Sequence, residues 1–189
     1  MGAIAVLILE TGMRRGFRPA FAAGTGAAAA DLTYAALAAV AGPPIAAALS
    51  SFTRALQLGS AALLLAIGLR GLWAAKRNAA GPPAGSNLAR GALRTFWQFL
   101  GLTLLNPLTM AYFAALVLGR GLENSLSAAG RLAFVAGAWL ASWSWQSLLA
   151  ASGALAQRLL SRRAQQLTTI LGNAVVIGFG LRILAGLFG

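Results

Sequence analysis

Long stretches without a charged residue recur along this chain, and they constrain its fold more than any other feature. They cover residues 32–53, 55–69, 95–119, 132–157 and 164–181. A helix needs about 20 predominantly apolar residues to cross the ~30 Å hydrocarbon core of a bilayer. Charged residues make up 10% of the chain, whereas a soluble domain has about 25%. The pattern therefore predicts an all-α integral membrane protein.

The run between Arg94 and Arg120 has a polar break at its centre. Its 25 uncharged residues contain Asn106-Pro107. Proline removes a backbone donor and obstructs the carbonyl one turn earlier, so we expect a helix to kink or break there. Backbone groups freed at membrane depth are tolerated only where they are buried in protein or line a cavity. A broken, polar centre in an apolar span is typical of a translocation site.

The hydropathy pattern predicts six transmembrane helices in a single domain, 1–189. We expect them at about 1–13, 19–41, 52–74, 95–118, 132–155 and 166–187. The first is only about half as long as a spanning helix, so we interpret it as truncated or as starting further upstream. Residues 42–51 are expected to form a turn. A flexible linker over about 76–92 leaves three helices on each side, which favours a 3+3 inverted repeat.

Composition excludes several classes of protein. Cys and His are absent, and only Glu10, Asp31 and Glu123 are acidic. Thiolate and imidazole metal sites, haem ligation and Ser-His-Asp catalysis are therefore excluded, and the carboxylates are too few for a metal cage. We expect no enzyme, no cofactor and no metal.

The positive charges predict an orientation in the membrane. Eleven of the fifteen basic residues lie on the first, third and fifth connections, namely Arg14, Arg15, Arg18, Arg70, Lys76, Arg77, Arg90, Arg94, Arg158, Arg162 and Arg163. Cytoplasmic loops carry an excess of Lys and Arg. We expect the odd-numbered loops in the cytoplasm and both termini outside. The net charge of +12 is then a topology signal, which argues against a nucleic-acid partner.

Asp31 is the acidic residue that the predicted spans place deepest. An ionisable side chain inside a span costs ~2.5–3.5 kcal/mol on insertion scales and is a functional hypothesis by default. The alternative is a packing hydrogen bond to Tyr34 or to a neighbouring Ser or Thr. Glu10 lies four residues before Arg14, and we interpret these two as a solvated pair at a helix end.

Several polar residues share one predicted depth. Asp31, Asn106, Gln146 and Gln57 each lie 12 or 13 residues from an arginine at the cytoplasmic end of their helix, and Asn173 lies 10 residues from one. At 1.5 Å per residue these distances place them about 15–20 Å deep, near the midplane. The count predicts a polar midplane site, with backbone opened by Pro107. Trp143 is either an apolar wall of this site or an ordinary packing residue.

The chain resembles the lysine exporter (LysE/RhtB) family of amino-acid efflux transporters over nearly its whole length. The segment from Gly2 to Arg18 is similar to the family's Pro-Gly-Pro opening and Arg-Gly turn, although Met1-Gly2-Ala3 lacks both prolines. Residues 24–31 resemble its small-residue helix with an acid. Leu105-Asn106-Pro107 resembles its Asn-Pro-Lys motif, with Leu108 in place of the lysine.

The resemblance implies six spans in a bacterial inner membrane and proton-driven export of amino acids or related metabolites. It also implies a small-molecule substrate and contact with membrane lipid, and leaves open a homo-oligomer. From the residues, Asp31 is the candidate for proton exchange or for binding an ammonium group. The alternative is a structural or assembly membrane protein without transport activity, whose polar residues serve helix packing.

Overall fold

The protein is all-α in the part of the chain that its computed structural model describes, which is residues 2–51, 53–76, 88–106 and 127–188 with 109 and 113. The helices are α1 (Ala3–Arg15), α2 (Phe17–Ser51), α3 (Thr53–Lys76), α4 (Leu88–Leu104), α7 (Ala128–Leu159) and α8 (Arg162–Phe188). The predicted fold class is confirmed at this level. The six spans and the inverted repeat stay predictions.

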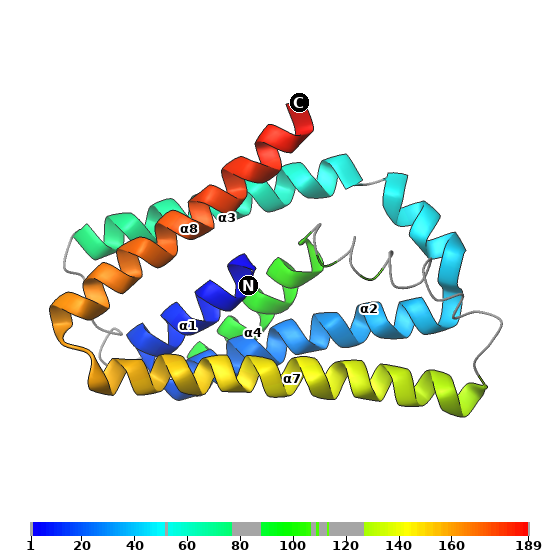
Figure 1. Cartoon of the computed structure of the whole chain (residues 1–189), viewed down its shortest axis with the longest axis horizontal. Coiled ribbons are helices and arrows are strands. Elements are labelled where there is room, and N and C mark those ends of the chain that lie inside the picture. The colour runs from blue at the N-terminus through cyan, green and yellow to red at the C-terminus, as the bar shows by residue number, and fades with distance from the viewer. Residues whose placement is uncertain are drawn as a thin grey trace.

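The short helix α1 lies at the centre of the molecule (Figure 1). On one side it packs against α7 and α2, and α2 in turn packs along both α7 and α4. On its other side α1 contacts α8, which pairs along its length with α3. Gly16 follows α1 with φ of 83°, a left-handed conformation that glycine adopts without steric cost. The chain can therefore turn directly from α1 into α2.

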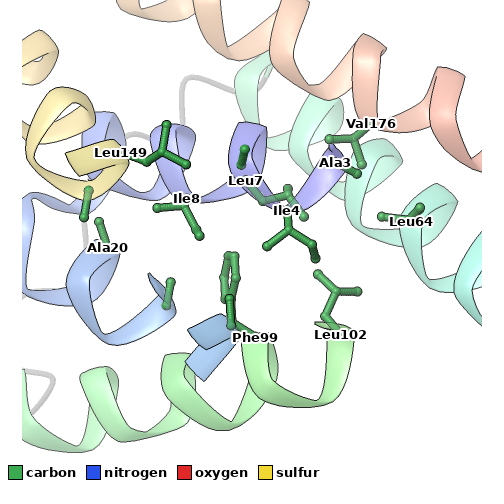
Figure 2. Close-up of a cluster of buried hydrophobic side chains, with 14 residues drawn as sticks. Ala3, Ile4, Leu7, Ile8, Ala20, Leu64, Phe99, Leu102, Leu149 and Val176 are labelled. Carbon is green, nitrogen blue, oxygen red and sulfur yellow. The ribbon is translucent and has the colours of Figure 1, made fainter. Parts of the chain in front are cut away.

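The buried core surrounds α1 (Figure 2). Ile4, Leu7 and Ile8 of α1 contribute to one apolar cluster with Phe99 and Leu102 of α4. The other helices add Ala20, Ala23, Ala27, Leu64, Leu149, Ala150 and Val176. Many large apolar side chains on the outer faces are exposed instead, as expected for helices that face lipid.

The contact between α1 and α7 is close because glycine occupies both sides of it. A Cβ atom on Gly12 would lie 2.9 Å from the backbone nitrogen of Ala154 and 2.9 Å from the backbone of Gly153. A Cβ on Gly153 would lie 2.5 Å from the carbonyl oxygen of Leu9. Small residues let helices approach in this way, so α1 is held firmly against the long helix α7.

The helix boundaries correct several predictions. The predicted turn at 42–51 is wrong, because α2 continues to Ser51 and changes direction in its last, cyan part (Figure 1). The helix therefore runs through positions 43 and 44 without ending, and a proline in a helix interior can kink it without breaking it. Residues 88–92 of the predicted linker are helical, and α4 ends at Leu104, well before the predicted end at 118. The rest of the linker, 77–87, lies outside the described residues.

Helix length and hydropathy support a membrane location only in part. Arg163–Leu187 is the one stretch of the described residues that is long and apolar enough to cross a bilayer, and Gln57–Trp73 is apolar but shorter. Helix α1 has 13 residues, fewer than a spanning helix needs.

Candidate functional site

A cavity of about 860 Å³ lies between α2, α4 and α7, beside the first residues of α1. Three of the residues predicted to form a site line it, namely Asp31, Asn106 and Gln146. Its other lining residues are Gly2, Ile4, Ala5, Thr103, Thr109, Phe113, Ala133, Phe134, Gly137, Ala138, Ala141, Ser142 and Trp145. We call this space the Asp31 cavity. It is large enough for an amino acid and several water molecules.

Asp31 is positioned by a face of α2 that carries almost no side-chain bulk. Gly24, two turns before it, meets α7 so closely that a Cβ atom there would lie 3.0 Å from Cβ of Gln146. Ala27 and Ala28 on the same helix are fully buried. This close packing brings Ser142 of α7 to the acid, and its hydroxyl donates a 2.6 Å hydrogen bond to Oδ2 of Asp31.

The partner of Asp31 is thus a serine of another helix, and Tyr34 has a different role. The Tyr34 hydroxyl donates a 2.5 Å hydrogen bond to the carbonyl oxygen of Leu104, and its ring stacks on Phe113 at 5.7 Å. Leu104 is the last residue of α4, so its carbonyl has no partner further along a helix. Tyr34 satisfies a backbone group that the end of α4 exposes.

The break in α4 occurs where the sequence predicts it. The helix ends at Leu104, and the amide of Asn106 turns back to the carbonyl of Thr103 at 3.1 Å. Pro107 has no N–H group with which to serve that carbonyl in a continuing helix. Pro107 itself lies outside the described residues. Asn106 therefore sits at a helix end that faces the cavity.

Two polar atoms that border the cavity have no hydrogen-bond partner among the residues that the structure describes. They are Oγ1 of Thr103 and Oε1 of Gln146, and both are buried. A buried polar atom without a partner costs about 1–3 kcal/mol. Thr103 is 3% exposed, so bulk solvent reaches it poorly. A ligand or an internal water in the cavity would supply the missing bonds.

Two other predicted site residues lie elsewhere. Gln57 is not among the residues that line the Asp31 cavity. Trp143 packs within the protein, edge-on to Phe21 at 5.9 Å and stacked on Trp139 at 6.0 Å. Trp143 is therefore not among the residues that line the Asp31 cavity, and its ring contacts fit the packing alternative. The indole that does line the cavity belongs to Trp145.

Asn173 belongs to a second cluster, which the sequence did not predict. It is 1% exposed, and its Nδ2 donates to Oε1 of Glu10 and to the carbonyl of Thr169, both at 2.8 Å. Glu10 also accepts a 3.2 Å hydrogen bond from Nη1 of Arg14. Glu10 is 7% exposed, so the interpretation of a solvated pair is wrong for the acid. The pair itself forms.

This cluster borders another cavity, of about 780 Å³, between α1, α3, α4 and α8. Its lining residues are Leu7, Glu10, Thr11, Arg14, Arg15, Leu63, Ala66, Ile67, Arg70, Gly71, Trp97, Gln98, Phe99, Gly101, Leu102, Leu105 and Asn173. We call it the Glu10 cavity. Neither space holds a metal-ligand set, since the described residues contain no group of three or more acidic side chains.

Apolar helices around two partly open cavities, each with a few polar and charged side chains in its lining, are compatible with the class of helical membrane translocators. The chain belongs to the LysE type translocator family, whose model matches residues 1–186. No curated protein matches the chain. No solved structure matches it either. The family resemblance is confirmed, and the protein is a membrane transporter of amino acids or related compounds.

Proposed function

We propose that this transporter exports amino acids or similar small metabolites across the bacterial inner membrane in exchange for protons, and that the Asp31 cavity is its substrate site. The observation that carries the proposal is the convergence of Asp31, Asn106 and Gln146 on one cavity. Asp31 lies on α2, Gln146 on α7, and Asn106 just beyond the end of α4. A site shared by helices on both sides of a translocation path is what secondary transporters use.

Asp31 is the group that exchanges a proton for a substrate ammonium group. It is the one ionisable side chain among the lining residues of its cavity, so its charge has no counter-charge there. A substrate ammonium group supplies that counter-charge. A proton bound to the Asp31 carboxylate makes the side chain neutral instead. Oε1 of Gln146, which lacks a partner, accepts a second hydrogen bond from the ammonium.

The opposite end of an amino acid needs hydrogen-bond donors. Thr103 offers a hydroxyl without a partner, and Asn106 lies beside it at the end of α4. The aromatic rings of Phe134 and Trp145 give the remaining wall an apolar surface. The site is therefore suited to a small molecule with a cationic end, a polar end and a partly apolar body.

The charge pattern suggests which way each cavity faces. With the odd-numbered connections in the cytoplasm, Arg14, Arg15 and Arg70 lie at the cytoplasmic end of the helices. The Glu10 cavity, which these arginines line, then faces the cytoplasm. The Asp31 cavity lies beyond it toward the outside.

Transport into inside-out membrane vesicles tests the proposal. We expect vesicles that contain the chain to accumulate some member of a labelled amino-acid panel when their lumen is acidic, and a protonophore to abolish the accumulation. Asp31→Asn should lower accumulation at least about a hundredfold while thermal unfolding stays close to that of the parent. Glu123→Gln, which also removes one acid, is the control and should transport normally.

The competing role for Asp31 is helix packing through Ser142. In that case Asp31→Asn would lower the unfolding temperature and leave the transport rate per folded molecule unchanged. Accumulation in the parent that does not depend on the proton gradient would instead contradict the proposed proton coupling. It would still support the proposed transport activity.

A further inference from the structure

We infer that the Glu10 cavity is a second binding site, which admits the carboxylate of a neutral or acidic amino acid and discriminates against dibasic ones. The inference rests on the proposed transport and specifies its substrate class. It starts from the charge of the lining. Glu10 is the one acid there, beside Arg14, Arg15 and Arg70, so the formal charge of the lining is +2.

At the deep end of this cavity, the negative charge of Glu10 is already paired with groups of the protein. Glu10 accepts hydrogen bonds from Arg14 and from the buried amide of Asn173. Asn173 is held in place by Gly71 of α3, where even a Cβ atom would overlap the amide group. The Glu10 carboxylate is therefore committed to partners within the protein and is a poor receptor for a substrate ammonium group.

The mouth of the cavity has cations without partners. Arg15 lies at the end of α1 and Arg70 on α3, and both side chains are exposed. Neither makes a hydrogen bond or an ion pair within the described residues. The guanidinium group presents a fork of donors that matches a carboxylate. Gln98 of α4 lines the same space and adds an amide.

The two cavities carry opposite charge. The lining of the Glu10 cavity has a formal charge of +2 and that of the Asp31 cavity −1. A zwitterion entering from the basic side is bound first by its carboxylate and then, in the Asp31 cavity, by its ammonium. A second ammonium on the side chain is repelled by Arg15 and Arg70 at the first step, because like charges at close range are unfavourable.

Equilibrium binding to the purified full chain in nanodiscs tests this inference separately from transport. The probes are labelled glutamate, threonine and lysine at low ionic strength, because salt screens exposed charges. We expect glutamate and threonine to bind at least about fivefold more tightly than lysine.

Charge-removing variants assign the preference to this cavity. Arg15→Gln and Arg70→Gln should each weaken glutamate binding about two- to fivefold, and the double variant should lose the discrimination against lysine. The matched controls are Arg18→Gln and Arg54→Gln, exposed arginines that line neither cavity. These should bind as the parent does.

Three results would overturn the inference. They are lysine binding as tightly as glutamate, a double variant indistinguishable from the controls, and no binding of any of the three probes. Vesicle accumulation measured in parallel separates these failures from the proposed function. Proton-driven accumulation of lysine, for example, would contradict the preference for neutral or acidic amino acids. It would still support the proposed function as a proton-coupled exporter.

Discussion

At the scale of single residues, the bond between Ser142 and Asp31 is the contact on which the Asp31 cavity depends. It joins α7 to α2 at 2.6 Å. A hydrogen bond from a hydroxyl to a carboxylate is short and stronger than one between neutral groups. The serine therefore fixes the direction in which the carboxylate points, and with it the place where the proposed ammonium group would bind.

Ser142→Ala should reduce transport at low substrate concentration about tenfold, since a hydrogen bond to a charged group contributes ~1.5–3 kcal/mol. Initial rates in inside-out vesicles measure this. Ser144→Ala is the control, because the Ser144 hydroxyl bonds only to carbonyls of its own helix. Equal rates for the two variants would mean that Ser142 does not position the acid.

The sequence predicted part of the Asp31 cavity and missed the Glu10 cavity for related reasons. Counting residues from the arginines gives depth in the membrane, and that count selected Asp31, Asn106 and Gln146. It gives no direction around the helix axis, so Asn173 was assigned to the wrong cluster. Glu10 was missed because an acid four residues before an arginine is usually a surface pair. Its burial depends on α3 and α8, which no local pattern reveals.

At the scale of elements, the contact of α1 with α7 shows what a short helix needs in order to lie at the centre of the molecule. With 13 residues, α1 has few side chains with which to hold its place. It relies on backbone contact through Gly12 and Gly153. The sequence shows these glycines but not that they face each other, because they are far apart in the chain.

Gly12→Ala should lower the free energy of unfolding by about 1–3 kcal/mol, because the added methyl group meets backbone atoms that cannot rotate away. Thermal unfolding in detergent measures the change. Gly178→Ala is the control, since a Cβ atom there has no neighbour within 4 Å. An unfolding temperature equal to the control's would show that α1 and α7 can separate without loss.

Of the break in α4 and the end of α2, the sequence predicted the first correctly and the second wrongly. The break at Asn106-Pro107 was predictable because proline acts on its own helix. The continuation of α2 through residues 42–51 was not, because Gly-Pro-Pro is typical of a turn and yet does not prevent a bent helix.

At the scale of the whole molecule, the two cavities meet at the apolar cluster around α1. Leu7 and Leu102 line the Glu10 cavity, whereas Ile4 and Thr103 line the Asp31 cavity. Ile4, Leu7 and Leu102 belong to one buried cluster (Figure 2). These side chains separate the two polar spaces and offer no hydrogen bond to water or to a substrate.

Leu102→Ala should open a path between the cavities and let protons leak without substrate. The decay of a pH gradient across vesicles that contain the chain measures the leak. Leu132→Ala removes the same atoms from an exposed position on α7 and should leave the gradient as stable as in the parent. A gradient equally stable with Leu102→Ala would show that this leucine does not seal the path.

An apolar seal between two cavities also acts as an electrical insulator when water fills the cavities. Water conducts ions far better than apolar side chains do, so with water in both cavities most of the membrane voltage would fall across the few residues of the cluster. A charge that crosses the whole voltage changes its energy by ~2.3 kcal/mol per 100 mV. Under the proposed exchange of protons for substrate, a charge carried past Ile4, Leu7 and Leu102 would take up most of that energy in a single step.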